Sequence, residues 1–433
     1  MRKILSLIAV FTAAISLQAQ TYNVEDLLRA DRRLAAGNEG HYRFEAPALT
    51  PSPKGYTPFY IGHYGRHGSR YSWTPNTYTV IKTVLDAADK AGALNEVGKK
   101  FYEEYNDFYM TPFINAGDLS ALGWEQQHKI AEITVANFPE IFAKGGKVLA
   151  RASTSQRAIV SMNGFTVGLQ KAAPKVDITA NSLHTNMIVC NPPGAPKEMQ
   201  ERYAGDFKIP GGESPADLRL RKYDYDEVLG HIFNSTELFE EIGGKSNFVG
   251  TLYNFWAGYR NYCDDERFEH LFTPEQAVHG WEVDNYSNFI SQSRDRFNNI
   301  PLLRDIINCA QEAIETGEYA AHFRFGHDTV LNAFVPLLNL NGCGYVPETA
   351  DEVKYWFQNF NCPMASNVQF VLYRSKKNPE ILFKVVWNGI EATIPQLEPV
   401  EGPYYRWTDF VAWAEKIYAE HPQVPVPQMP RWN

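Results

Sequence analysis

The sequence predicts an α/β fold: a parallel-rich central sheet flanked by helices, with a mainly helical cap insertion. Three short apolar runs of high β-propensity, 56–64, 147–152 and 320–325, each end in polar residues and continue into a helical pattern. Helical segments lie between these runs, so the strands are best paired in parallel. One long stretch, 176–301, has aromatic and acidic residues on helical spacing, and we expect it to cap the sheet.

The chain begins with the features of a secretory signal peptide. Arg2 and Lys3 precede an apolar run over 4–17 that is shorter than the roughly 20 residues needed to cross a bilayer. The alternative is a membrane anchor or a buried first helix. We expect residues 1–19 to be removed and the mature protein to be periplasmic or secreted, with no membrane span. The core then comprises 20–175 and 302–433, and the cap 176–301.

Composition limits the classes of partner. The chain has 433 residues, of which 44% are hydrophobic, so it can bury a large core. Its formal net charge is −9, and loss of Arg2 and Lys3 with the signal makes it −11. Such an acidic protein is a poor candidate for binding nucleic acid, and any anion site must concentrate positive charge locally. The composition does not indicate an oligomeric state.

Five cysteines are scattered through the chain without a CxxC pair, at 190, 263, 309, 343 and 362. In an exported protein they could form up to two disulfides, whose connectivity the spacing leaves open. A zinc site is not expected.

The remaining elements follow from local patterns. A short helix is predicted over 23–36, with Asn23 as its N-cap and Gly37 as its stop, and a connector with four prolines leads to the first strand. Further helices are expected over 76–91, 120–137, 153–169 and 330–338, and a hairpin over 367–374 and 381–388. Right-handed crossovers place all three strand-to-helix turns at one edge of the sheet. Because neighbouring strands lie about 4.8 Å apart, these turns can meet around one small ligand.

The first turn carries an imidazole between two arginines, Arg66-His67-Gly68-Ser69-Arg70. Guanidinium groups bind phosphate oxygens in a bidentate manner and stay charged. Gly68 permits a tight turn, and cations around His67 favour the neutral, nucleophilic imidazole. The alternative is a pair of surface arginines beside a structural histidine. The second arginine and the flanking glycines favour an anion site.

The second turn adds Arg157, in the first turn of a helix, where free backbone N–H groups favour an anion. Its alternative is an exposed helical residue. Arg151, inside the strand, is a weaker candidate for the site and can instead form a buried ion pair. The third turn is His327-Asp328, which can also be a helix cap or part of a metal-dependent His-Asp hydrolase site. We expect no metal, because the arginine cluster would repel a cation and suitable further ligands are lacking.

These motifs resemble the histidine acid phosphatase branch of the histidine phosphatase superfamily. The resemblance covers about 56–388 and rests on four segments: RHGSR at 66–70, GDLSALGWEQQH at 117–128, RASTSQRAIVS at 151–161 and GHDT at 326–329. It implies a phosphoglycerate mutase-like core and no cofactor. The roles it implies are nucleophile for His67, proton donor for Asp328, and phosphate binding by four further residues. These are Arg66, Arg70, Arg157 and His327.

Two features concern the subgroup. The RHGSRY form and HLFTPEQ at 270–276 are similar to multiple inositol polyphosphate phosphatases, although those commonly carry His-Ala-Glu where this chain has His327-Asp328. The family often has proline two places after the second arginine, where this chain has Ser72. The loop that carries Arg70 is therefore expected to differ from the family pattern.

The expected function is hydrolysis of a small phosphate ester through a phosphohistidine, with inositol polyphosphates such as phytate as candidate substrates. Alternatives are a broad-specificity acid phosphatase acting on sugar phosphates and, in another class, a non-catalytic phosphate-binding protein. A phosphate mutase is disfavoured because its phosphorylated cofactor is usually cytoplasmic. Six basic residues of the cap region are either a polyanion subsite or a solvated face. They are Lys197, Arg202, Lys208, Arg219, Arg221 and Lys222.

Overall fold

The computed structural model of the chain describes residues 23–192, 207–242 and 244–421. The predicted signal peptide, 1–19, lies outside these ranges. Within them, no helix combines the length and the apolar character needed to cross a membrane. All five cysteines lie in the described residues and all are unpaired, so neither of the disulfides that the sequence allowed is present.

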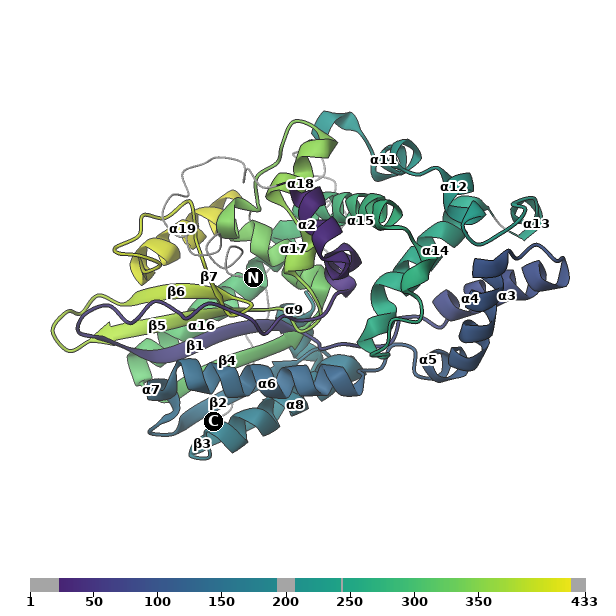
Figure 1. Cartoon of the computed structure of the whole chain (residues 1–433). Helices are drawn as coiled ribbons and strands as arrows, with labels where there is room; N and C mark the ends of the chain where they lie inside the picture. The colour runs from purple at the N-terminus through teal and green to yellow at the C-terminus, as the bar shows by residue number, and fades with distance from the viewer. Residues whose placement is uncertain (1–22, 193–206, 243, 422–433) are drawn as a thin grey trace, which may run out of the picture.

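A mixed sheet forms the centre of the molecule, and its strand order is β3-β2-β4-β1-β5-β6-β7, with β8 paired to β6 (Figure 1). The strands are β1 (Tyr56–Arg66), β2 (Gly146–Ala152), β3 (Val176–Asn181), β4 (Tyr319–Gly326), β5 (Asn367–Ser375), β6 (Leu382–Trp387), β7 (Ile390–Ala392) and β8 (Tyr405–Arg406). The first four pair in parallel, and β5 to β8 extend the sheet antiparallel. The predicted α/β class and the predicted hairpin are confirmed.

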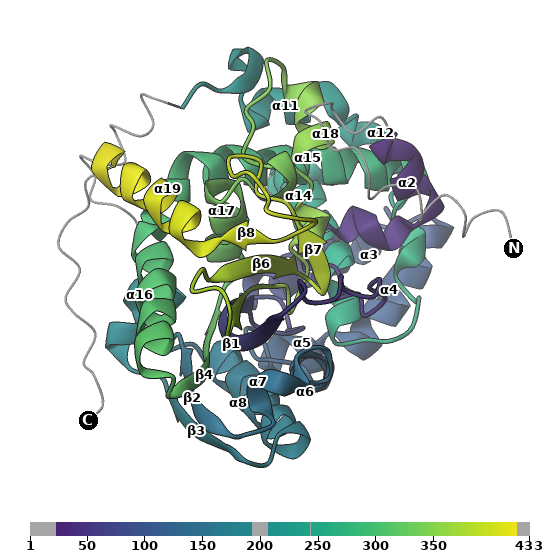
Figure 2. The ribbon, with the colours of Figure 1, turned by 90° about the vertical axis from the view of Figure 1, so that its left-hand side faces the viewer.

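Alternating residues of the strands feed two separate hydrophobic layers. Phe370 and Leu372 of β5 pack with α16 (Ile300–Thr316), α17 (Asp328–Leu337) and α19 (Trp407–Glu420). Val371 and Tyr373, on the opposite face, belong to the layer of α6 (Ala121–Asn137) and α8 (Gln156–Ala172). Figure 2 shows these two helical layers on either side of the sheet. The central strands are therefore buried on both faces, as parallel strands require.

Two observations bear on the expected bounds of the cap, 176–301. Strand β3 falls inside 176–301 but belongs to the sheet, because it pairs with β2 over its whole length. In addition, α3 (Asn76–Lys90), α4 (Glu96–Phe108) and α5 (Met110–Ile114) lie beside α14 (Lys245–Gly258), away from the sheet (Figure 1). Their apolar faces share one cluster with α14, in which Phe101 and Phe255 are in contact. We propose that these helices are part of the cap.

The N-terminal helix is shorter than predicted and is followed by a tighter one. Asn23 caps α2 (Val24–Ala30) by accepting a hydrogen bond from the Glu25 N–H, so the predicted cap is confirmed. The chain leaves the helix at Asp31 and continues as the 3-10 segment η1 (Arg32–Glu39). Gly37 has φ +56°, which bends the chain inside η1 rather than ending it. This bend brings Asn38 and Glu39 to the edge of the sheet.

Candidate active site

The three predicted turns meet at one edge of the sheet. Strand β4 lies between β1 and β2, and its hydrogen bonding continues past the strand ends. The His67 N–H donates to the Gly326 carbonyl at 3.0 Å, and the Ser153 N–H donates to the Phe325 carbonyl at 3.0 Å. The expectation that turns far apart in the sequence would converge is confirmed.

His67 lies at the centre of this edge and is 1% exposed. Its Nδ1 is 2.9 Å from the Gly68 carbonyl oxygen, which can only accept a hydrogen bond. Nδ1 therefore carries the proton, and Nε2 has the free lone pair. Burial, reinforced by Arg66 and Arg70, lowers the pKa of His67 well below its usual value. The imidazole is thus neutral, which is the nucleophilic state.

The loop after His67 is held by α6 and α8. The Gly68 N–H donates to Ser161 Oγ and the Ser69 N–H to Gln126 Oε1, both at 2.9 Å. A Cβ atom on Gly68 would lie 2.2 Å from the carbonyl oxygen of Gly123. Only glycine at position 68 therefore lets α6 pack this closely. This contact explains why the segment 117–128 accompanies the RHGSR motif.

Three guanidinium groups surround His67. Arg66, with no exposed surface, donates from Nη1 to the backbone carbonyls of Asn38 and Cys362. Arg70 is 5% exposed, and Arg157 is half-buried in the first turn of α8. The Nε–H group of each of the three is buried and has no hydrogen-bond partner among the described residues. Buried donors are nearly always paired, so these three unpaired N–H groups are candidates for binding an anion.

His327 follows β4 and is placed by Tyr64, whose hydroxyl oxygen accepts from the His327 N–H at 3.0 Å. Its Nδ1 is 3.5 Å from an Arg157 nitrogen and therefore accepts, while Nε2 lies 2.9 Å from Ser153 Oγ. The His67 and His327 rings are 5.6 Å apart. Burial and Arg157 lower the pKa of His327 to about 4. His327 is consequently neutral at pH 7, not protonated.

Asp328 begins α17, and its side chain is 21% exposed. Its Oδ2 accepts from Asn38 Nδ2 at 3.0 Å and from Arg66 Nη2 at 3.2 Å. Burial alone would raise the pKa of this carboxyl, but Arg66 and Arg70 outweigh burial and bring it to about 2. Asp328 is therefore a carboxylate.

Two site residues, Asn38 and Glu39, were not anticipated. Asn38 contacts Asp328, and Glu39 Oε1 accepts from Arg70 Nη2 at 2.9 Å and from Arg66 Nη2 at 3.4 Å. The sequence carries no motif at these positions. The bend at Gly37 was the available signal, because a glycine that turns the chain within a helical stretch can redirect the residues after it.

Other predicted candidates lie elsewhere. Arg151 forms a buried ion pair with Asp305 of α16 at 2.5 Å. This is the alternative to a role in the site that the sequence analysis gave for Arg151. In the cap region, Arg221 pairs with Glu213, and Lys222 pairs with Glu282. Lys197 and Arg202 lie outside the described residues.

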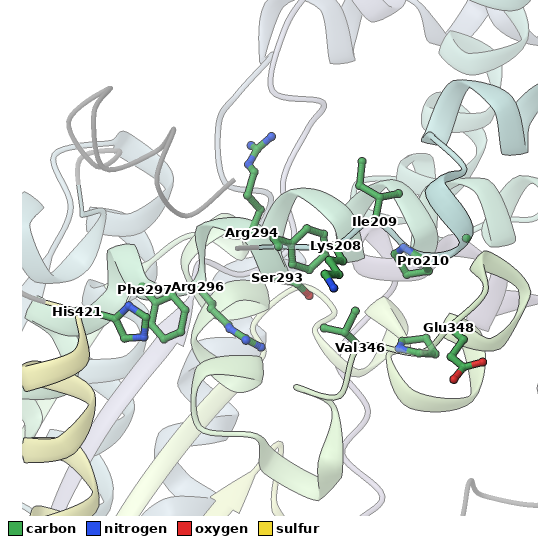
Figure 3. Close-up of a pocket in the computed structure, with 13 residues that line it drawn as sticks. Lys208, Ile209, Pro210, Ser293, Arg294, Arg296, Phe297, Val346, Glu348 and His421 are labelled. Carbon is green, nitrogen blue, oxygen red and sulfur yellow. The ribbon is translucent and has the colours of Figure 1, made fainter. Parts of the chain in front are cut away.

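Lys208 lines a pocket of about 520 Å³ together with Arg294 and Arg296 (Figure 3). None of the residues lining this pocket belongs to the arginine cluster around His67. The pocket is therefore separate from the edge of the sheet at which the three turns meet.

Comparisons with known proteins bear on the fold. No family model and no curated protein matches the sequence. The solved structure of Bifidobacterium longum multiple inositol polyphosphate phosphatase with inositol hexasulfate matches with a TM-score of 0.74 at 18% identity, covering 90% of this chain and 99% of that chain. The phytase from D. castellii matches with a TM-score of 0.64 at 15% identity, covering 95% and 90%. The apo Hafnia alvei phytase gives 0.53 at 13% identity, covering 87% and 100%. The chain therefore has the α/β fold of these phosphatases, the fold that its sequence motifs imply.

Proposed function

We propose that the protein is a phosphomonoesterase that forms a phosphohistidine at His67. The observation that carries this proposal is the set of three buried, unpaired guanidinium Nε–H groups around a neutral imidazole. A tetrahedral oxyanion would satisfy these donors, since arginine forks match phosphate geometry. Such an arrangement stabilises the equatorial oxygens of a phosphoryl group during transfer.

In the first step, His67 Nε2 attacks phosphorus in line with the ester bond. The new N–P bond forms as the P–O bond to the leaving group breaks, and Asp328 gives its proton to the departing oxygen. Arg66, Arg70 and Arg157 hold the three equatorial oxygens. The products are a phosphohistidine, the free alcohol and a carboxylate at Asp328.

In the second step, water attacks the phosphohistidine, and Asp328 accepts a proton from that water. The N–P bond breaks, the electron pair returns to His67 Nε2, and inorganic phosphate leaves. Asp328 therefore loses one proton in the first step and regains one in the second, so it ends the cycle in its starting state.

The proton on Asp328 depends on the bound substrate. Without a bound anion the carboxyl is ionised, because Arg66 and Arg70 lower its pKa to about 2. A phosphate dianion on the same arginines offsets their charge and raises the pKa of Asp328 toward protonation. Asn38 and Arg66 both engage Oδ2, so the proton is carried on Oδ1.

Inositol polyphosphates, including phytate, are our first candidate substrates, and sugar or other small phosphate esters are the alternative. Support comes from the fold shared with phytases and from the RHGSRY form of the first motif. A panel of esters assayed for kcat/KM will rank these classes. We also propose that the chain is exported, which predicts a mature N-terminus near residue 20.

Release of inorganic phosphate from an ester tests the function. His67→Ala is expected to abolish release while phosphate still binds, since the arginines remain. Quenched wild-type enzyme should carry acid-labile phosphate on His67. Phosphate binding without any ester hydrolysis by the wild type would instead indicate the alternative of a non-catalytic phosphate-binding protein.

A further inference from the structure

Glu39 places a carboxylate among the groups that the proposed reaction assigns to phosphate. Its Oε1 accepts from Arg70 Nη2 at 2.9 Å and from Arg66 Nη2 at 3.4 Å, and its side chain is 22% exposed. The mechanism uses no such carboxylate, because an anion beside the arginines repels the substrate. The position of Glu39 therefore needs a physical explanation of its own.

The backbone around Glu39 is fixed to the catalytic loop. Asn261 Nδ2 donates to the Glu39 carbonyl at 2.7 Å, and Asn261 Oδ1 accepts from Ser69 Oγ at 2.7 Å. The second carboxylate oxygen, Oε2, faces Gly258 at the end of α14, where an added Cβ atom would lie 3.4 Å from it. The carboxylate is thus held between the cap and the RHGSR loop rather than left in solvent.

Charge balance explains what this carboxylate does. Arg66, Arg70 and Arg157 supply three positive charges. When Asp328 carries its proton, Glu39 is the carboxylate that contacts Arg66 and Arg70, and the three guanidiniums together with Glu39 have a net charge of +2. A phosphomonoester carries about −2 at neutral pH, so the charges match.

The influence of Glu39 extends across the site. Burial and Arg70 lower the pKa of Arg157, and the charge of Glu39 opposes that effect. Glu39 also raises the pKa of Asp284 on α15 (Pro274–Asp295), which Arg219 of α11 (Pro215–Lys222) lowers.

We propose that Glu39 is a positioning residue that orients Arg66 and Arg70 and, by its charge, keeps the site from binding phosphate too tightly to release it. This inference rests on the proposed function. Without Glu39, three guanidiniums would meet the dianion with an excess positive charge. Substrate and product would then both bind more tightly, which lowers KM without accelerating the reaction.

Glu39→Gln tests the inference because it keeps the acceptor oxygen and removes the charge. We expect the dissociation constant of inorganic phosphate, measured by calorimetry at pH 7, to fall by about tenfold, which corresponds to about 1.4 kcal/mol. KM for an ester should fall with it, and kcat should fall because product release is slower. Glu39→Asp restores the charge and should return phosphate affinity toward the wild-type value.

Glu269→Gln is the matched control. Glu269 is also 22% exposed and also lies 2.9 Å from an arginine, Arg260, but contacts neither Arg66 nor Arg70. It should leave phosphate affinity unchanged. Unchanged or weaker phosphate binding by Glu39→Gln, in a variant that melts like the wild type, would overturn the role of Glu39. If the wild type binds phosphate but hydrolyses no ester, the proposed function fails, and the binding comparison still decides the role of Glu39.

Discussion

At the scale of single residues, the proposed mechanism requires Asp328 to be both an anion and an acid within one cycle. Arg66 and Arg70 lower its pKa to about 2, so the carboxyl is ionised. In the proposed mechanism the substrate's charge acts on the same arginines. Substrate binding would then protonate Asp328, and a leaving group that needs no proton should bypass this requirement.

Asp328→Asn separates these cases. The variant keeps nearly the same shape but cannot deliver a proton, so phosphorylation of His67 by alkyl phosphates should slow much more than phosphorylation by p-nitrophenyl phosphate. General acid catalysis contributes about 10²–10⁴-fold, which sets the size of the difference. The measurement is enzyme phosphorylation in a single turnover, because the hydrolysis step also uses Asp328. Equal losses for both substrates would assign Asp328 to binding or capping.

Arg157 is predicted to act in the ground state and in the transition state. Arg157→Ala should raise KM and lower kcat together, with kcat falling by about 10²–10³-fold, the usual effect of removing one oxyanion donor. Arg157→Lys keeps the charge but loses the forked geometry and should recover only part of the activity. Steady-state kinetics of the two variants provide the comparison. A rise in KM alone would place Arg157 in ground-state binding.

At the scale of elements, the sequence predicts which residues follow the strand ends. It does not predict that η1 lies against the candidate site. The strands β1, β2 and β4 are short apolar runs followed at once by His67, Ser153 and His327, so pattern and right-handed crossovers suffice to bring these turns together. Glu39 reaches the site because the chain turns back toward the sheet after the bend at Gly37. No local sequence pattern predicts this tertiary contact. The placement of α3 to α5 beside α14 is likewise a matter of tertiary packing.

One buried charge cluster fastens α16 to the sheet. Asp305 of α16 pairs with Arg151 of β2 and with Arg324 of β4, and both arginines are at most 5% exposed in their side chains. The two guanidiniums outweigh burial and hold the pKa of Asp305 well below its usual range. Arg324 lies inside the apolar run AAHFRF. An arginine within a buried strand needs a buried carboxylate as its partner, so the sequence indicates such a partner without identifying it.

Asp305→Asn should therefore be strongly destabilising. It leaves two buried guanidiniums without a counter-charge, which typically costs about 3–5 kcal/mol in the free energy of unfolding. Urea denaturation at pH 7 measures the change. The control is Glu318→Gln, which removes the exposed pair with Lys147 and should cost far less stability than Asp305→Asn. Similar losses in the two variants would contradict the assigned role of the cluster.

At the scale of the whole molecule, neutral buried histidines run along the sheet from its centre to the active edge. His63 and His322 lie within β1 and β4, and His67 and His327 follow these strands. Burial is the main cause that lowers all four pKa values, to about 3 for His63 and to about 4 for His327. Asp284 is the opposite case, because burial raises its pKa to about 6.

The sign of the pH dependence follows from these shifts. Between about pH 6.5 and pH 4 the unfolded chain binds a proton at each of the four histidines and the folded chain does not, so folding stability falls as pH falls. Each of these histidines changes the free energy of unfolding by up to about 1.4 kcal/mol per pH unit. Asp284 has a raised pKa and therefore acts in the opposite direction.

His63→Gln should remove the contribution of one histidine to the pH dependence of the free energy of unfolding. His63 packs against Phe165, Phe323 and Phe325, so the variant will lose some stability at every pH. That constant loss does not affect the comparison, which is the difference in the free energy of unfolding between pH 6 and pH 5. Urea denaturation should give a slope smaller than that of the wild type by about 1.4 kcal/mol per pH unit. His322→Gln is a second variant with the same expectation. Wild-type slopes in both variants would mean that these two histidines bind protons in the folded protein, and the acid sensitivity would then have to come from other groups with lowered pKa values, such as His67 and His327.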